Sequence, residues 1–132
     1  MVNVTAPAPP PGKPHGHIEY YSFPDEAKVD EAKSWSLKIH NDGDDSGVIF
    51  AGIANMPGNP GNIEVYCNET GETYTISPGY ILRIYGTRGV CSRVEISGTV
   101  KFKAEGSYVI RLVGGHKEGD SWIDDEKVDI NG

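Results

Sequence analysis

The residues whose types and spacing could do chemistry begin with the oxygen-bearing side chains of Asp42, Asp44 and Ser46. They occupy alternate positions in the run Asp42–Gly47, which matches the ligand spacing and the following glycine in the first half of an EF-hand calcium loop. The twelfth position of such a loop carries a bidentate glutamate, but here it is Ile53. A solvated acidic hairpin turn is the simpler interpretation. Calcium binding at these three residues is therefore a hypothesis, and a solvated turn is its alternative.

A second group of carboxylates lies in the last part of the sequence. Its members are Asp120, Asp124, Asp125 and Glu126. They could bind calcium at a loop, because calcium takes several carboxylate oxygens. A solvated edge strand explains them more simply, since charges on an edge strand prevent it from pairing with another chain.

Four histidines could supply imidazole ligands to a metal ion. His15 and His17 flank a single glycine, and His40 and His116 lie elsewhere in the chain. Nothing spaces these residues or the cysteines as a zinc site, so ordinary surface histidines are the simpler interpretation. We predict neither a bound metal ion nor a cofactor.

Cys67 and Cys91 are the two cysteines of the chain. In an oxidising compartment they could form a disulfide that closes a loop of about 25 residues, worth roughly 3 kcal/mol. As two buried thiols they would instead act as small apolar side chains. Asn3 and Asn68 each begin an N-glycosylation sequon on a segment that we expect to be exposed. The sequons favour an extracellular or cell-surface location.

Aromatic residues could form a platform on which sugar rings stack, as in a carbohydrate-binding module. We select Tyr20, Tyr21 and Trp122 for this role, with Tyr74 and Tyr85 as further members. Packing of the same rings in the core and along the strands is the alternative. Burial of Tyr20 and Trp122 would exclude the platform.

Motifs for catalysis are sparse. The sequence has no nucleophile elbow, no phosphate-binding Gly-Lys motif and no histidine-rich metalloenzyme pattern. Carboxylates are abundant enough to provide the pair that a glycoside hydrolase needs, but their separations do not follow from the sequence. A small domain without a long lid loop is a poor enzyme. We therefore predict a noncatalytic protein, with a small metal-dependent hydrolase as the least favoured alternative.

The elements that position these side chains are strands. In Gly98–Gly114, Val100 and Phe102 alternate with polar residues before a break, and Ile110 and Leu112 alternate with other residues after it. Period-two patterning on both sides of a break predicts two β-strands, because successive side chains of a strand point to opposite faces.

Three ways of joining these two strands remain open. A two-residue hairpin across Glu105-Gly106 would mix a charge into the apolar face, whereas a three-residue loop ending at Ser107 would keep one clean face. The third is a corner between two sheets, for which Gly106-x-Tyr108 resembles the tyrosine corner of immunoglobulin-like sandwiches. In that corner the tyrosine hydroxyl hydrogen-bonds to upstream backbone.

The rest of the chain reads as further short strands. We expect them over residues 17–23, 34–41, 48–54, 63–67, 73–77, 80–85, 90–96 and 121–130, with an edge strand first, a central strand over 48–54 and loops over 25–33 and 114–120. Their number, about eight to ten, predicts an all-β, immunoglobulin-like antiparallel β-sandwich. Residues 1–16 hold five prolines and predict an extended arm or linker, so the single sandwich domain spans residues 17–132.

Composition narrows the class of partner. A net charge of −7 argues against a nucleic-acid partner, which needs clustered Lys and Arg. No apolar run reaches the length that would insert into a membrane. A protein partner or self-assembly remains, and the arm over residues 1–16 is the element that we expect to reach a neighbouring subunit.

The order of features resembles the cell-adhesion-related family of immunoglobulin-like domains in bacteria and archaea. The resemblance rests on the strand end Ile39–Gly43, on Pro78-Gly79 before a strand and on Phe102 followed by Gly106-x-Tyr108, and it covers roughly residues 23–130. It implies a noncatalytic surface or adhesion module without universal binding residues. We therefore expect a structural or adhesion module of an extracellular surface, filament or virion, with a carbohydrate-binding module as the alternative.

Overall fold

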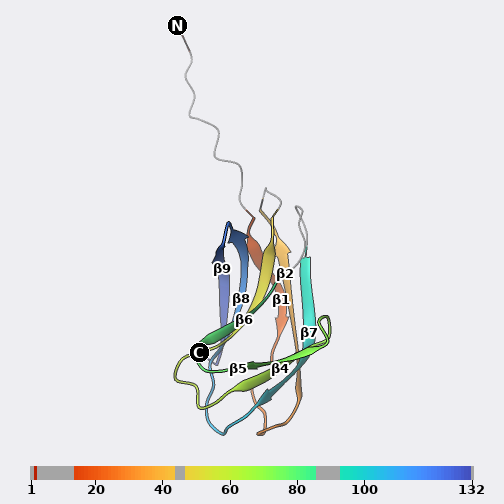
Figure 1. Cartoon of the computed structure of the whole chain (residues 1–132), viewed down its shortest axis with the longest axis vertical. Coiled ribbons are helices and arrows are strands. Elements are labelled where there is room, and N and C mark those ends of the chain that lie inside the picture. The colour runs from red at the N-terminus through yellow and green to blue at the C-terminus, as the bar shows by residue number, and fades with distance from the viewer. Residues whose placement is uncertain (1, 3–13, 44–46, 86–92, 132) are drawn as a thin grey trace.

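The chain folds into two antiparallel β-sheets, seen in the computed structural model of Figure 1. The structure describes Val2 and residues 14–43, 47–85 and 93–131. These residues form nine strands: β1 (Gly16–Ser22), β2 (Lys33–Asn41), β3 (Ile49–Asn55), β4 (Ile63–Cys67), β5 (Glu72–Ile76), β6 (Tyr80–Tyr85), β7 (Arg93–Phe102), β8 (Ile110–Glu118) and β9 (Ser121–Ile130). Sheet A has the order β1-β2-β7-β4-β5, and sheet B has the order β6-β3-β8-β9. The predicted all-β sandwich is confirmed.

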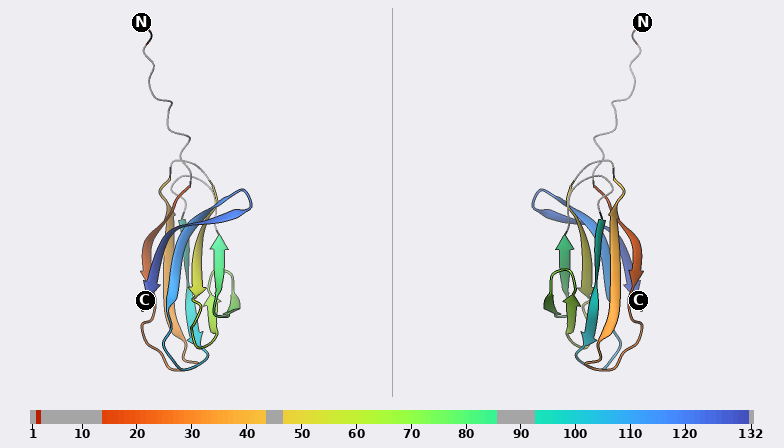
Figure 2. Two further views of the ribbon diagram at one scale, coloured as in Figure 1. Left: turned by 90° about the vertical axis from the view of Figure 1, so that its left-hand side faces the viewer. Right: turned by 90° about the vertical axis from the view of Figure 1, so that its right-hand side faces the viewer.

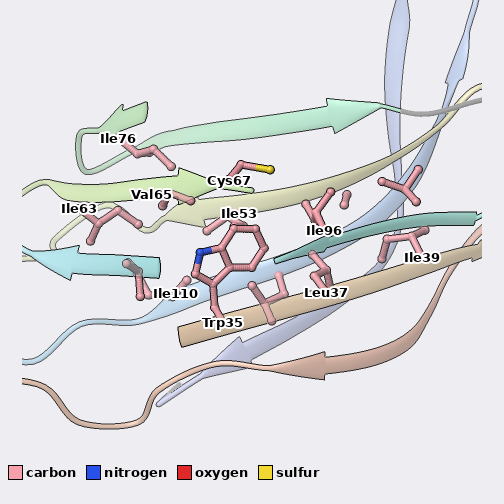
Figure 3. Close-up of a cluster of buried hydrophobic side chains, with 14 of the residues drawn as sticks. Trp35, Leu37, Ile39, Ile53, Ile63, Val65, Cys67, Ile76, Ile96 and Ile110 are labelled. Carbon is pink, nitrogen blue, oxygen red and sulfur yellow. The ribbon is translucent and has the colours of Figure 1, made fainter. Parts of the chain in front are cut away.

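The hydrophobic core lies between the two sheets. Trp35, Leu37 and Ile39 project from β2, where the predicted alternation is confirmed, and they pack with residues of β3 and β4 that include Ile53 and Val65 (Figure 3). The indole Nε1 of Trp35 donates a hydrogen bond to the carbonyl of Thr99 at 3.1 Å, so the polar atom of this core side chain is satisfied. Trp35 therefore anchors the core as its sequence position predicts.

The connection from β7 to β8 crosses between the sheets, because β7 belongs to sheet A and β8 to sheet B. Both hairpin alternatives are thus wrong, and the corner is correct. The Tyr108 hydroxyl donates to the Ala104 carbonyl at 2.9 Å and accepts from the Ala104 N–H at 3.2 Å. Gly106 has a φ of 136°, which favours glycine over other residues. A crossing corner keeps the apolar side of each strand toward one shared core.

Two strands run further than the sequence pattern predicts. β7 continues unbroken through Gly98, and β8 continues to Glu118, where we expected a loop over 114–120. Glycine serves in both places for close packing rather than for turning. A Cβ at position 98 would lie 1.7 Å from the carbonyl oxygen of Tyr66, and a Cβ at Gly115 would lie 2.4 Å from the Phe50 ring.

The remaining strand predictions are confirmed within one or two residues at their ends. β3 is a central strand between β6 and β8, and β1 is an edge strand of sheet A. The segment between β1 and β2 forms a loop with one isolated bridge, from Val29 to Phe102. The described ranges contain no helix long and apolar enough to span a membrane.

The start of the folded body lies slightly before the predicted boundary. Gly16 is already part of β1, Pro14 is buried, and the backbone N–H of His15 donates to the side-chain oxygen of Asn41 at 3.1 Å. Residues 3–13 of the predicted arm lie outside the described residues.

Candidate binding surfaces

Asp125 holds one end of the sandwich together. We call this end the polar end and define it by Gly16, His17, His116, Asp125 and Glu126. The pairing of β8 with β9 shifts register between Gly114 and Gly115, which leaves Asp125 as the extra residue of a bulge. Its Oδ2 accepts the backbone N–H of Gly16 at 2.8 Å and lies 2.7 Å from Nδ1 of His116. Asp125 thereby joins the edge strand of one sheet to the edge strand of the other.

Glu126 makes a second set of contacts to β1 at the same end. One carboxylate oxygen accepts the backbone N–H of Ile18 at 3.0 Å, and the other lies 2.9 Å from Nδ1 of His17. The hydrogen bond to Glu126 raises the pKa of His17, with further support from the charges of Asp42 and Glu19 and opposition from burial. The polar end therefore combines backbone and side-chain hydrogen bonds between the sheets.

These contacts revise the interpretation of the histidines and the second acidic group. His116 is only 4% exposed, so the prediction of a surface histidine is wrong there. The bulge explains this, since it turns a carboxylate toward the ring from the neighbouring strand. Asp125 and Glu126 hold β1 in place instead of simply facing solvent.

The polar end does not assemble a metal site among the residues that the structure describes. Asp42, the first residue of the predicted calcium loop, lies 2.5 Å from Nδ1 of His15 through its Oδ1. Asp44 and Ser46 lie outside the described residues. The calcium hypothesis for the three residues together therefore remains a prediction.

The outer face of sheet B carries a cluster that we call the aromatic face: Phe50, Arg83, Tyr85, Lys117 and Trp122. The Trp122 ring packs edge-on against Phe50 with centroids 5.3 Å apart and lies 5.4 Å from Tyr85 at an interplanar angle of 38°. The guanidinium carbon of Arg83 lies 5.4 Å from the Phe50 centroid, and Nζ of Lys117 lies 5.2 Å from that of Trp122. Two cations thus flank a cluster of three aromatic rings, in the geometry of cation–π contacts.

The predicted sugar platform is only partly gathered here. Trp122 is half-buried and contacts Tyr85, which is 64% exposed. Tyr20 and Tyr21 are exposed but lie on β1 in sheet A, whereas Trp122 lies on β9 in sheet B. The structure therefore places Trp122 beside Tyr85, one of the further members, and on a different sheet from Tyr20 and Tyr21.

The outer face of sheet A is chemically different. The outward residues of β2 and β7 pair as Ser36 with Ser97 and Lys38 with Glu95, and Tyr66 of β4 pairs with Thr73 of β5. Hydroxyl and charged groups dominate this face, which suits a surface in contact with water.

The end of the sandwich opposite the polar end opens into a cleft of about 740 Å³, which we call the end cleft. The β1–β2 and β7–β8 connections line it. These connections lie at the end of the sandwich away from the projecting β8–β9 hairpin (Figure 2). The lining of the cleft combines loop residues with strand ends: Pro24, Asp25, Glu26, Ala27, Lys28, Val29, Phe102, Ala104, Glu105, Gly106, Ser107, Tyr108, Ile110, Ile130 and Asn131. The Phe102 and Tyr108 rings are in contact, with centroids 4.9 Å apart.

The cysteines and the sequons occupy separate places. Cys67 is buried on β4, and its Sγ lies 3.4 Å from Oε2 of Glu69. Asn68 is exposed, and its side-chain nitrogen donates to the hydroxyl of Ser97 at 3.2 Å. Cys91 and Asn3 lie outside the described residues, so the disulfide and the first sequon stay predictions.

The end cleft is the surface that sequence reasoning missed. One signal for it was present, since Val29 is the one large apolar residue in the mainly charged loop over residues 24–32 and is 43% exposed. No family model, curated protein or solved structure matches the chain.

Proposed function

We propose that the protein is a noncatalytic structural or adhesion module, with an immunoglobulin-like fold, that serves as a domain or subunit of an extracellular surface, a filament or a virion. The observation that carries this proposal is the aromatic face of sheet B. Aromatic and Arg side chains are the residue types enriched where proteins bind one another. Here they gather in contact on one outer face, while hydroxyl and charged groups dominate the other, on which Tyr20 and Tyr66 belong to different strands.

The accessible part of the aromatic face is suited to contact a partner. Tyr85 is 64% exposed, and its ring leans on the half-buried Trp122, which in turn rests on the fully buried Phe50. A ring supported in this way loses little side-chain entropy when a partner covers it. The face therefore presents a rigid apolar centre between the cations Arg83 and Lys117.

The hydrogen bonds of the polar end support a structural rather than a catalytic role. His116 and Asp125 are the buried His–carboxylate pair that an enzyme could use, but Asp125 also accepts the backbone N–H of Gly16. The pair therefore helps to hold β1 against β9. The immunoglobulin-like assignment draws on the Tyr108 corner, whose hydroxyl bonds to the backbone of Ala104.

The experiment is sedimentation velocity across a concentration series on the full chain and on two tyrosine variants. Tyr85→Ala removes the exposed ring of the aromatic face, and Tyr80→Ala is the matched control because Tyr80 is equally exposed at 66% and lies on the same strand. We expect association that Tyr85→Ala weakens and Tyr80→Ala does not. Monomers at every concentration would contradict the self-assembling form of the proposal.

A carbohydrate-binding module is the second candidate, and the exposed Tyr85 ring beside Trp122 favours it. Sugar rings stack on such aromatic surfaces. Electrophoresis of the chain through gels that contain soluble polysaccharides tests this candidate. Retardation that Tyr85→Ala abolishes would favour it over a protein partner, and unchanged mobility on every polysaccharide would argue against it.

A further inference from the structure

The end cleft has the chemistry of a site for an apolar segment without negative charge. Its lining includes Phe102, Tyr108 and Ile130, and its volume of about 740 Å³ lies within the range of natural binding pockets, about 300–1,000 Å³. Three carboxylates, of Asp25, Glu26 and Glu105, lie along its lining against the single amine of Lys28. A bound segment should therefore be apolar and neutral or basic.

A segment of this description exists in the chain itself. Residues 6–13, which we call the Pro-rich segment, contain Pro7 and the run Pro9–Pro11 and end in Lys13. Residues 1–18 contain no acidic residue. Proline-rich segments bind aromatic-lined grooves because their extended conformation is already restricted, so little entropy is lost on binding. Lys13 also matches the carboxylates of the cleft.

We propose that the Pro-rich segment of one copy binds in the end cleft of a second copy. The proposal rests on the assembling role proposed above, but it uses a surface other than the aromatic face. The segment joins the body at Pro14, next to His15, whose N–H bonds to Asn41 at the polar end. The β1–β2 and β7–β8 connections that line the cleft lie at the opposite end (Figure 2).

The length of the Pro-rich segment determines that the cleft must belong to another copy. Asn41 lies opposite Gly16 at the polar end, and β2 runs from there back to Lys33, which is about eight residues or roughly 27 Å of strand. The cleft lies beyond that point. Pro7 is about seven residues from Pro14 and can reach at most about 25 Å from it when fully extended. Its own cleft is therefore out of reach for the prolines.

A contact between opposite ends of identical copies does not close on itself. The donor surface and the acceptor surface are different, so each added copy leaves one free segment and one free cleft. Repeated contacts of this kind build an open chain of copies, which suits the filament form of the proposed function.

The first test is the binding of a fluorescently labelled peptide of residues 3–13 to the full-length chain, followed by fluorescence anisotropy. Val29→Glu places a charge on the cleft lining at a 43% exposed loop position. We expect it to weaken binding roughly tenfold or more, because an apolar contact is lost. Glu105→Lys, a second cleft variant at an exposed position, should also weaken binding by repelling Lys13.

The outcomes separate this proposal from the proposed function. Loss of binding in both cleft variants and unchanged binding in Tyr85→Ala supports the proposal. No binding at all, or equal binding to the cleft variants and the unmodified chain, overturns it. Loss of binding in Tyr85→Ala alone also overturns it, since the segment would then bind the aromatic face and leave the proposed function standing. Circular dichroism establishes that each variant is folded.

A complementation experiment gives the sharpest result. Both chains carry Tyr85→Ala, which removes association through the aromatic face. One chain carries Val29→Glu in addition, and the other carries Pro7→Ser, Pro9→Ser, Pro10→Ser and Pro11→Ser in addition. Each alone should be monomeric in sedimentation velocity, because one lacks a working cleft and the other lacks a working segment. Their mixture should form a discrete dimer, since one cleft and one segment remain intact. A mixture that stays monomeric contradicts the proposal.

Discussion

The two ends of the sandwich close the same kind of core in opposite ways. At the polar end, Asp125 and Glu126 accept backbone and histidine hydrogen bonds that tie β1 to β9. At the end cleft, the Phe102 and Tyr108 rings lie under loops and leave a cavity of about 740 Å³. Hydrogen bonds between the two sheets fasten the first end, whereas the Tyr108 hydrogen bonds at the second end stay within the β7–β8 connection and leave the cleft free to accept another group. The difference separates a structural end from a binding end.

The largest expected effect comes from breaking the polar end with Asp125→Ala. The substitution removes the acceptor for the N–H of Gly16 and for the buried His116 ring. We expect a loss of about 3 kcal/mol in the free energy of unfolding, because two donors are left without a partner in a buried site. Denaturant unfolding followed by circular dichroism measures it.

Asp125→Asn is the matched control for this prediction, since its amide retains one acceptor oxygen of similar shape. Its destabilisation should fall between zero and that of Asp125→Ala. Equal stability of the unmodified chain and Asp125→Ala would show that the polar end does not fasten β1.

A smaller effect is expected at the end cleft from Tyr108→Phe. The variant keeps the ring contact with Phe102 but removes the hydroxyl that bonds to the backbone of Ala104. We expect a loss of about 1–2 kcal/mol, measured by the same unfolding experiment. Tyr80→Phe, at an exposed position, should be neutral. If the two variants lose equal amounts, the corner hydrogen bonds are not a source of stability.

The smallest effect is a pH dependence carried by His17. Its pKa is raised above the ordinary value of 6.5 by the hydrogen bond to Glu126. A raised pKa in the folded state means that the stabilising contribution is complete below pH 6.5 and disappears as the pH rises through the raised value. Because the ring is partly exposed, the contribution should stay below about 1 kcal/mol.

Comparison of the chain with His17→Gln between pH 5 and pH 9 tests this prediction. The stability difference between them should shrink as the pH rises. A difference that grows with pH would contradict the raised pKa and would indicate that the His17 ring is favoured in its neutral form.

The strands were predictable because their side chains alternate locally. The pattern around Trp35 and Leu37 predicts β2 with its buried face, and the Gly106-x-Tyr108 motif was sufficient to include the corner among three alternatives. Local pattern failed at Gly98 and Gly115, where glycine suggested a break or a loop. Their role depends on a neighbouring strand that approaches within the space of a Cβ.

The candidate sites were less predictable because they combine residues that are distant in sequence. Asp125 meets Gly16 only after the two sheets have packed edge to edge, and the bulge that turns it inward leaves no pattern in the sequence. The end cleft likewise needs the loop near Val29 to pass over Phe102. The spacing and the composition of these residues in the sequence do not predict that they come into contact.

The bond between Gly16 and Asp125 also sets an order of events during synthesis. The two residues are 109 positions apart, so β1 leaves the ribosome long before its fastening strand exists. At about 5–20 residues per second, the delay is roughly 5–20 s. Until β9 emerges, β1 lacks its hydrogen bonds to Asp125 and Glu126, and the strand with which it forms a hydrogen-bonded ladder is β2. A nascent copy therefore passes through a period in which β1, the first strand to be synthesised, still lacks its hydrogen bonds to β9.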